Sequence, residues 1–287
     1  MKTIHGFLNL QRLFASHPLT SDAPLRAWLR FAKWQLRSRL QEEILIDWIG
    51  GQKLAVRRGM TGATGNIYVG LHEFFDMMIP LHLLRRNDLF LDVGANVGTY
   101  TVLASGICQA TTYAFEPDPS TLCWLKRNIE VNRLEERVQV HDCALGARSG
   151  EAKFTVGRDT LNRFANAGDA ATRTVRMETL DNVVGNAQPV MMKVDVEGAE
   201  LDVLLGAKCV VANPSLNVIE PETVSPQCAE MLSRHGFEIG RYDPFRRTLN
   251  RDSAGRRSSN TLFVRDWSFV NERLQTAPPV EIFDREV

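Results

Sequence analysis

Three ionisable side chains alternate along one apolar segment of the chain. Lys193, Asp195 and Glu197 occupy every second position within residues 189–198, whose other members are mostly apolar. Alternate side chains of a strand point to the same face, so we expect the three charges to meet there. Burying several ions costs free energy, which favours a chemical role. A structural salt bridge between Lys193 and an acid is the alternative.

This trio suits the transfer of a group to a hydroxyl. Asp195 is the first choice for the base that takes the proton, with Glu197 and Glu220 as orienting groups beside it. Lys193 would stabilise a developing alkoxide. Asp195 and Glu220 follow two successive expected strands, so they could also bind a divalent cation such as Mg²⁺.

A second chemical segment covers residues 88–100. The apolar residues 89–93 predict a strand buried on both faces, and the run after residue 99 predicts a helix. Between them lies the turn Asp-x-Gly-x-Asn-x-Gly, which begins at Asp92. A strand, a glycine-rich turn and a helix form a nucleotide site at the carboxyl end of a parallel sheet. The expected contacts in this turn are Gly94, Ala95, Asn96, Gly98, Thr99 and Tyr100.

The spacing of the turn separates two nucleotide chemistries. A dinucleotide fingerprint would read G-x-G-x-x-G, whereas this turn has two glycines and begins with an acid. A carboxylate repels a pyrophosphate but suits a ligand with an ammonium group, such as S-adenosylmethionine. The turn therefore favours that cofactor over a dinucleotide.

The next two expected strands supply further contacts. Glu116 and Pro117 end a short strand 24 residues after Asp92 (116 − 92). An acid at this spacing can accept hydrogen bonds from both hydroxyls of a ribose. Asp142 and Cys143 lie in the following strand segment, residues 138–145, whose end would reach the adenine.

With these motifs the chain resembles the FkbM family of S-adenosylmethionine-dependent methyltransferases. The matching text is Leu-Asp-Val-Gly-Ala-Asn-Val-Gly-Thr-Tyr at 91–100, Phe-Glu-Pro at 115–117, Thr-Leu-Asp at 179–181 and Met-Lys-Val-Asp-Val-Glu-Gly-Ala-Glu at 192–200. The last string is the most particular to this family. The match covers roughly residues 66–266.

The resemblance implies an α/β, Rossmann-like class I methyltransferase with a seven-stranded, mostly parallel sheet and helices on both faces. It implies O-methylation of a sugar, glycan or natural-product hydroxyl, and it places Glu73 near the cofactor or the acceptor. Two other functions stay open: a nicotinamide-dependent oxidoreductase, disfavoured by the missing fingerprint, and a non-catalytic nucleotide-binding subunit. The subunit reading predicts that Lys193 and Asp195 are dispensable.

Composition sets broad limits on partners. The formal net charge is zero, so no overall field indicates nucleic acid. The five cysteines form no C-x-x-C pair and indicate a reducing compartment. No apolar run approaches the roughly 18 residues of a spanning helix, and no signal peptide is evident. The cytoplasm is the expected location.

An N-terminal helical and hairpin extension is expected over residues 1–65, before a cofactor-binding domain over 66–270 and a tail over 271–287. Within the extension, residues 24–40 predict a helix with a basic stripe beside one apolar face, which consists of Leu25, Trp28, Leu29, Ala32, Leu36 and Leu40. Three roles are open for this helix: packing on the catalytic domain, a homo-oligomer contact through Phe31 and Trp34, or peripheral contact with an anionic membrane.

Several connecting segments are also assigned. Residues 43–55 predict a hairpin around Gly50 and Gly51, residues 57–65 a polar loop and residues 66–69 a short strand. Residues 157–171 form a long loop that could cover the acceptor. Residues 243–259 form a basic loop that is either a solvated tip, the more ordinary case, or a contact for a phosphate.

Overall fold

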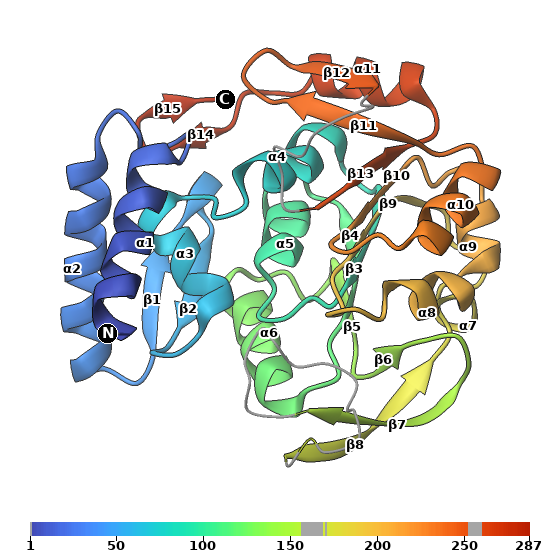
Figure 1. Ribbon diagram of the computed structural model, residues 1–287, viewed down its shortest axis with the longest axis horizontal. Helices are drawn as coiled ribbons and strands as arrows, with labels where there is room; N and C mark the ends of the chain where they lie inside the picture. The colour runs from blue at the N-terminus through green and yellow to red at the C-terminus, as the bar shows by residue number, and fades with distance from the viewer. Residues whose placement is uncertain (1, 156–168, 170, 252–259) are drawn as a thin grey trace.

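A sheet of eight strands forms the centre of the computed structural model, which describes residues 2–155, 169, 171–251 and 260–287 (Figure 1). The strand order is β12-β11-β13-β10-β9-β3-β4-β5. Strands β13 and β12 run antiparallel to the other six. The strands of this sheet are β3 (Leu89–Val93), β4 (Thr111–Phe115), β5 (Val138–His141), β9 (Pro189–Val194), β10 (Val218–Pro221), β11 (Glu238–Asp243), β12 (Thr248–Arg251) and β13 (Leu262–Val264).

The seven expected strands are present, and β12 is an eighth. The segment expected to be a loop over residues 243–259 instead turns back at Asp243, whose side chain accepts hydrogen bonds from the backbone of Phe245 and Arg246. The returning chain pairs with β11, and Arg251 forms an ion pair with Glu238 across the two strands. Residues 252–259 lie outside the described part of the chain.

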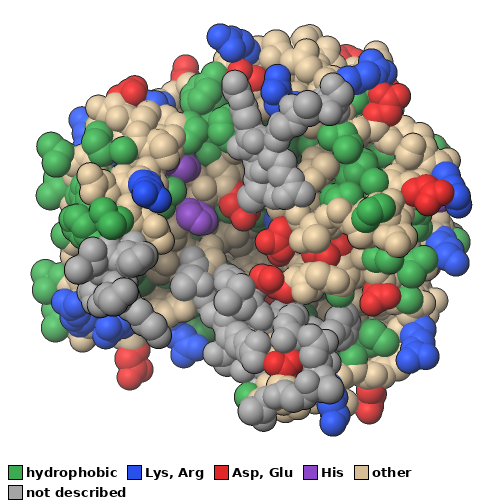
Figure 2. Space-filling view, viewed as in Figure 1, with side chains coloured by type: hydrophobic (Ala, Val, Ile, Leu, Met, Phe, Trp, Pro, Cys, Tyr) green, Lys and Arg blue, Asp and Glu red, His purple; other side chains and the backbone are tan. Residues whose placement is uncertain are grey.

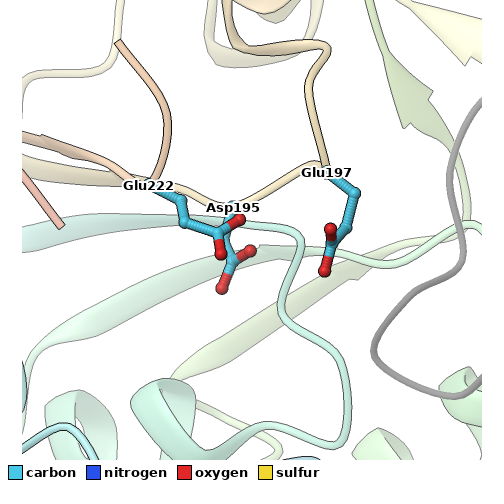
Figure 3. A group of neighbouring side chains, drawn as sticks. All are labelled: Asp195, Glu197 and Glu222. Atoms are coloured by element: carbon cyan, nitrogen blue, oxygen red, sulfur yellow. The ribbon is translucent and has the colours of Figure 1, made fainter. Parts of the chain in front are cut away.

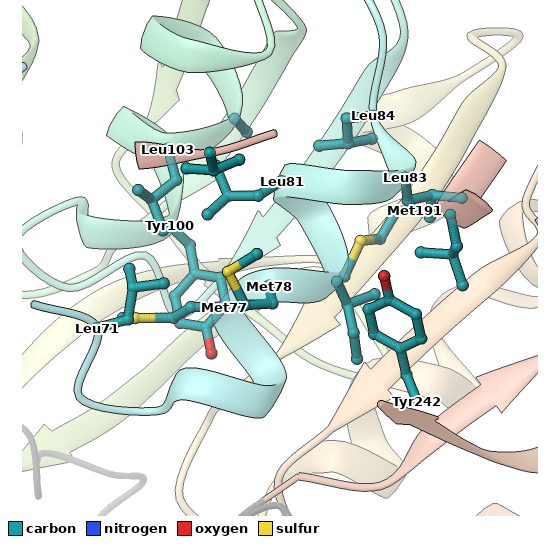
Figure 4. Close-up of a cluster of buried hydrophobic side chains, with 14 of the residues drawn as sticks. Leu71, Met77, Met78, Leu81, Leu83, Leu84, Tyr100, Leu103, Met191 and Tyr242 are labelled. Carbon is teal, nitrogen blue, oxygen red and sulfur yellow. The ribbon is translucent and has the colours of Figure 1, made fainter. Parts of the chain in front are cut away.

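Helices cover both faces of the sheet. Alternation along β3 divides its side chains, since Phe90 faces the core beneath α4 and α11 while Leu89 and Leu91 face the core beneath α7–α10. Figure 4 shows the first core, where the α4 residues Met78 and Leu81 lie near Leu103. The helices on the sheet are α4 (Phe74–Leu83), α5 (Thr99–Val102), η2 (Leu103–Ile107), α6 (Pro119–Val131), α7 (Leu180–Val184), α8 (Glu200–Leu205), α9 (Lys208–Ala212), α10 (Pro226–Arg234) and α11 (Trp267–Gln275).

A small sheet follows β5 in the chain. The segment expected as one strand over residues 138–145 breaks into β5 and β6 (Ala144–Leu145). β6 pairs in parallel with β8 (Thr172–Glu178), which pairs antiparallel with β7 (Gly150–Thr155), as expected for the last two. Between β7 and β8, only residues 169 and 171 of the expected cover loop 157–171 are described.

The N-terminal segment builds its own core on one side of the sheet (Figure 1). It contains the predicted hairpin and the predicted helix. Its elements are α1 (Lys2–Ser16), α2 (Pro24–Leu40), β1 (Ile44–Asp47), η1 (Ile49–Gly51), β2 (Lys53–Val56) and α3 (Thr61–Val69).

The prediction of a loop and a strand over residues 57–69 was wrong, because α3 occupies most of this segment. Ala63 and Ile67 are buried in the N-terminal core, and this burial outweighs the poor helix propensity of the glycines. Gly65 also allows close packing, since a Cβ there would lie 2.5 Å from the ring of His72. The expected boundary at residue 65 falls inside α3, and the one at residue 270 falls inside α11.

Helix α2 is turned the opposite way from our expectation. Ala27, Trp34 and Ser38 face the core, whereas the four leucines of the predicted apolar face point to solvent. Trp28 of that face is partly buried against the N-terminal core. Trp34 is only 4% exposed, so the predicted subunit contact through Phe31 and Trp34 was wrong. The aromatic side of α2 thus supplies the packing that the leucines were expected to supply.

The C-terminal tail ends in a short hairpin of β14 (Glu281–Ile282) and β15 (Arg285–Glu286) beside the N-terminal helices (Figure 1). Arg285 forms an ion pair with Asp22 at 2.6 Å and donates a hydrogen bond to the carbonyl of Pro18. The tail therefore ties the two ends of the chain together. Among the described residues, no helix combines the length and apolarity needed to cross a membrane.

Candidate active site

A cavity of about 370 Å³ opens at the carboxyl ends of β3, β4 and β9. Neighbouring strands of an open α/β sheet connect in opposite directions around such a point, and ligands bind there. Figure 2 shows acidic and histidine side chains gathered around a hollow at the centre of this face. The lining residues come from the ends of β3, β4, β9 and β10 and from α3, the start of α4, α5, β6 and β7.

The glycine turn after β3 permits two close approaches of the backbone. Gly94 has φ +81°, and a Cβ there would lie 1.8 Å from the carbonyl oxygen of Asp195. Gly98 has φ +88° and caps α5, and a Cβ there would lie 2.6 Å from Leu125. Gly94 lines the cavity but Gly98 does not. These glycines therefore position the loops around the cavity, which spacing alone did not reveal.

The remaining predicted contacts of this turn reach the cavity. Asn96 adopts φ +52°, and its side-chain oxygen accepts a hydrogen bond from the backbone of Val97 at 2.7 Å. This local hydrogen bond stabilises the left-handed backbone of Asn96, so the turn can border the cavity without a glycine at this position. The cavity wall here consists of Asp92, Val93, Gly94, Ala95, Asn96, Val97, Thr99 and Tyr100.

Glu116 lies at the tip of β4 as predicted and lines the cavity together with Pro117. Its two oxygens accept hydrogen bonds from the backbone amides of Asn96 at 3.1 Å and Asp118 at 2.8 Å. Burial raises the pKa of Glu116 to about 8 despite these donors. Each oxygen keeps a further lone pair, so the carboxylate can accept two ribose hydroxyls in the orientation that the amides fix.

Asp92 is buried at the end of β3 and also borders the cavity. Burial raises its pKa to about 6, while Lys193 and the hydroxyl of Thr101, which donates at 2.5 Å, act in the opposite direction. An acid of this kind favours a cationic group in the adjoining space. This is the feature that the sequence indicated for a sulfonium or ammonium ligand.

The far end of the cavity is apolar. Cys143 lines it as expected, whereas Asp142 lies outside the wall and pairs with Arg176 at 3.5 Å on the surface. Phe154 of β7 lines the same end and was missed by the sequence analysis. No local signal marks Phe154, because only the fold of the small sheet brings it to the cavity. The apolar wall here is made by Phe115, Cys143, Ala144, Leu145 and Phe154.

Lys193 and Asp195 form a buried ion pair with 2.6 Å between Nζ and Oδ2. The ammonium also lies 4.5 Å from the ring centre of Tyr100. Burial alone lowers the pKa of Lys193, but the carboxylates of Asp195, Glu73 and Asp92 outweigh it and raise that pKa. The lysine is therefore a fixed, buried positive charge in the cavity floor.

The predicted trio meets at the cavity, although not as one strand. β9 ends at Val194, and Glu197 sits beyond it with φ +52°, followed by Gly198 with φ +94°. Glu197 and Asp195 both line the cavity from this loop. Burial, followed by the charge of Asp195, raises the pKa of Glu197.

Glu222 is a further acid of the site that the sequence analysis missed. Oxygens of Asp195, Glu197 and Glu222 lie within 4.8 Å of one another, and Figure 3 shows the carboxyl groups of Asp195 and Glu222 side by side. β10 pairs Pro221 with Val194 of β9, which puts the next residues of the two strands together. Glu222 could be recognised only from this register. In the sequence it is simply an acid two residues after Glu220, which nothing distinguishes from other polar residues at strand ends.

Asp195 and Glu222 share a proton. Burial raises the pKa of both acids, but the charge of Lys193 outweighs it at Asp195 and lowers that pKa. At Glu222, burial and the Asp195 charge raise the pKa to about 8. Near neutral pH the pair therefore holds one proton, mainly on Glu222, in a hydrogen bond to ionised Asp195.

Glu220 lies behind the cavity rather than in its wall. It is fully buried, and burial together with the nearby Asp76 raises its pKa well above the ordinary value. Glu73, at the start of α4, accepts a hydrogen bond from Tyr100 at 2.7 Å and does line the cavity. Asp195 and Glu220 are thus not brought together as the metal ligands that the sequence suggested.

The donor set at the strand tips also fits a divalent cation poorly. Oxygens of Asp195, Glu197 and Glu222 lie within 4.8 Å of one another, but Asp195 already holds the Lys193 ammonium at 2.6 Å. A hard cation needs ionised oxygen ligands and would be repelled by the lysine. The chemistry of the site is therefore carried by its side chains alone.

The order of strands, the glycine turn and the carboxylate at the tip of β4 define a class I, Rossmann-like, S-adenosylmethionine-dependent methyltransferase. The chain belongs to the FkbM methyltransferase family, since residues 92–239, just over half of its length, match the Methyltransferase FkbM domain.

Curated relatives carry methyltransferase names. Methyltransferase sdnD of Sordaria araneosa is 28% identical over 58% of this chain and 80% of its own length. The hexuronic acid methyltransferase AglP of Haloferax volcanii is 29% identical over 47% of this chain and 56% of its own. The 31-O-demethyl-FK506 methyltransferase FkbM of Streptomyces tacrolimicus is 33% identical over 34% and 37%.

Proposed function

We propose that the protein transfers a methyl group to a hydroxyl of a sugar, glycan or hydroxylated natural product. The observation that carries this proposal is the carboxyl pair of Asp195 and Glu222, which lies beside Lys193 and faces the cavity. A hydroxyl must lose its proton during methylation, and this pair offers a place for it.

The cofactor site suits S-adenosylmethionine. Glu116 would accept the ribose hydroxyls, and the apolar end around Phe154 and Cys143 would hold the adenine. Asp92 would lie on the side of the sulfonium and the ammonium group. When bound, this cofactor supplies an electrophilic methyl group on a good leaving group. The protein's own task is then to align the acceptor and to receive its proton.

The acid pair receives the proton as a unit. With both acids ionised, the pair carries two negative charges and accepts one proton with an apparent pKa of about 8, the value at Glu222. Asp195 stays ionised because Lys193 is fixed against it, and its charge keeps the proton affinity of Glu222 high. Asp195, the base expected from the sequence, thus works through a partner, and Glu197 borders the acceptor side.

A sugar-like acceptor is supported by the name of one relative and by the polar groups in the cavity wall. The Haloferax volcanii relative is named a hexuronic acid methyltransferase. His72 and Glu197 border the cavity away from the adenine end, so polar groups lie where an acceptor would enter. A polyhydroxylated acceptor can satisfy such groups, whereas an apolar one would leave them unpaired.

Transfer of a ¹³C-labelled methyl group tests the proposal. The full chain is incubated with methyl-labelled S-adenosylmethionine and a panel of free and nucleotide-linked hexuronic acids, and products are identified by carbon NMR. We expect a methoxy carbon, absent with Asp195→Asn. A labelled methyl group on nitrogen or carbon would contradict O-methylation, and no product from any panel member would contradict the acceptor class. Full activity of Asp195→Asn would favour a different proton acceptor.

Family membership removes the oxidoreductase alternative, but a non-catalytic member remains a separate hypothesis. A non-catalytic subunit has no need for an ionised acid held against a buried lysine. It predicts cofactor binding without turnover in the wild-type chain on the whole panel. The buried charges of the site favour the enzyme, because such charges are costly to keep without a function.

A further inference from the structure

Four leucines of α2 stand in a line on the outside of the molecule. Leu25, Leu29, Leu36 and Leu40 are between 63% and 77% exposed. They lie at helical spacing on the side of α2 that faces away from Ala27 and the other core residues. In Figure 1, α2 is the outermost helix on its side, and Figure 2 shows hydrophobic side chains along that edge. A continuous apolar strip of this kind usually marks an interaction surface.

The surroundings of this leucine strip are basic. Residues 1–40 contain seven Lys or Arg (2, 12, 26, 30, 33, 37 and 39) and one acid, Asp22. Asp22 is paired with Arg285, and Arg26 is paired with Asp284. Lys33 and Arg37, beside the strip, form no ion pair with any residue in the described part of the chain. The strip therefore has uncompensated positive charge along one side.

A cavity lies beside α2 on its basic flank, next to the leucine strip. It has a volume of about 590 Å³, and apolar groups of the first hairpin line it. Its charged lining residues are Arg30, Lys33 and Arg37 of α2 against Asp47 and Glu281, which leaves the wall net positive. Lys33 and Arg37 border it beside Trp34 and Trp48. Helix α3 separates this cavity from the active site, and Asn66 of α3 borders both. Positive charge and apolar side chains converge here in the pattern that recognises an anionic head group with an attached chain.

We propose that α2 docks the protein on an anionic lipid surface. The leucine strip enters the region between head groups and acyl chains, and Lys33 and Arg37 meet lipid phosphates, one of them in the adjoining cavity. A helix with an apolar face, a basic flank and low overall hydrophobicity lies in the plane of such a surface. Basic residues add attraction because the surface is negative.

The charge decides between a membrane and a second copy of the chain. In a symmetric pair formed through the leucine strip, Lys33 and Arg37 of each copy would lie close to basic residues of the other copy. Like charges across an interface oppose association. An anionic surface turns the same residues into attractive contacts, so it fits the strip better.

Co-sedimentation of the full chain with vesicles tests this proposal. Vesicles of phosphatidylcholine mixed with phosphatidylglycerol are compared with vesicles of phosphatidylcholine alone. The variants are Leu29→Gln with Leu36→Gln, and Lys33→Gln with Arg37→Gln. Matched controls are Leu205→Gln on α8 and the pair Lys208→Gln with Arg241→Gln, which are exposed residues outside the N-terminal segment. Circular dichroism verifies that each variant is folded, and light scattering reports the mass.

We expect binding to the anionic vesicles only, weakening as salt increases. The basic pair should lose about fivefold in affinity for each charge removed, and the leucine pair about tenfold or more, while the controls bind as wild type. Absence of binding, or binding unaffected by the leucine pair, would overturn the proposal. A doubled mass that Leu29→Gln with Leu36→Gln returns to monomer, without vesicle binding, would assign the strip to a second copy instead.

Discussion

The ammonium of Lys193 lies 2.6 Å from Oδ2 of Asp195, with 3% of the lysine side chain exposed against 31% of the aspartate side chain. Both side chains border the cavity, but the lysine is almost fully buried in its floor while the aspartate is the more accessible of the two. A fixed cation below an accessible acid keeps that acid ionised. This arrangement explains how the neighbouring Glu222 can hold a proton near neutral pH and give it up just above.

Asp195→Asn should reduce the rate of methyl transfer by about 10²- to 10⁴-fold, the range for loss of a group in proton transfer. The substitution removes the ionised partner of both Lys193 and Glu222. Cofactor affinity should stay nearly unchanged because the ribose contact at Glu116 is intact. Turnover and calorimetry with S-adenosylhomocysteine measure the two effects. Asp202→Asn, at an exposed position of α8, is the control and should leave both unchanged.

The rate at saturating cofactor should rise with pH and level off above about 8. The pair of Asp195 and Glu222 can accept the acceptor's proton only after it has lost its own, and the pKa at Glu222 is about 8. Glu222→Gln should remove this rise. A wild-type rate that does not change between about pH 6.5 and about pH 9.5, a range on both sides of that pKa, would contradict the assignment. So would the same rise in Glu222→Gln.

Gly94→Ala should destabilise the protein more than Gly198→Ala. Both positions have positive φ, which costs an alanine about 1–2 kcal/mol. Only at Gly94 would the new Cβ also meet the carbonyl of Asp195, at 1.8 Å, whereas nothing lies within 4 Å at Gly198. The overlap should add at least about 1–3 kcal/mol and displace the Asp195 loop. Chemical denaturation measures the difference, and equal losses would contradict the close approach.

Glu220→Gln should stabilise the protein increasingly as pH rises. Burial and Asp76 raise the pKa of Glu220 in the folded state, so the folded protein holds a proton that the unfolded chain releases above its ordinary pKa of 4.5. The contribution of Glu220 to stability is therefore full below that value and is lost by about 1.4 kcal/mol per pH unit above it. Glutamine resembles the protonated acid and avoids this loss. The melting temperatures of wild type and Glu220→Gln, measured from about pH 5 to about pH 9, should therefore diverge as pH rises. Parallel curves would contradict a protonated Glu220.

The cofactor half of the site was predictable from the sequence because its contacts are local. The turn from Asp92 to Tyr100 and the acid at Glu116 follow directly from strand ends and their spacing. Gly98 and Asp142 are the exceptions, since they lie outside the cavity wall. Gly98 instead makes room for Leu125, and Asp142 reaches solvent where β5 ends.

The acid pair was only half predictable because it depends on register between distant strands. Asp195 stood out as a charge in an apolar strand, whereas Glu222 becomes its neighbour only through the pairing of Pro221 with Val194. The orientation of α2 failed for a related reason. Its leucines have the stronger periodicity, but Trp34 and Ala27 pack on α3 and the hairpin, and tertiary packing decides which side is buried.

The proposed ribose contact also predicts how cofactor affinity depends on pH. Glu116 must be ionised to accept two hydroxyls, and burial raises its pKa to about 8 without ligand. Binding should therefore release a proton below that pH, so affinity should rise as pH increases towards 8 and be constant above. Calorimetry in two buffers of different ionisation enthalpy detects this proton directly. Proton uptake on binding would contradict the assignment.

The most direct test of the account is a calorimetric titration of S-adenosylhomocysteine into the wild type, Glu116→Gln and Asp142→Asn, with NAD as the parallel ligand. We predict micromolar binding of S-adenosylhomocysteine and none of NAD. Glu116→Gln should weaken binding by about 10- to 150-fold, equivalent to about 1.5–3 kcal/mol for a charged hydrogen bond, and Asp142→Asn should not. Equal affinity in wild type and Glu116→Gln, or preference for NAD, would contradict the cofactor site described above.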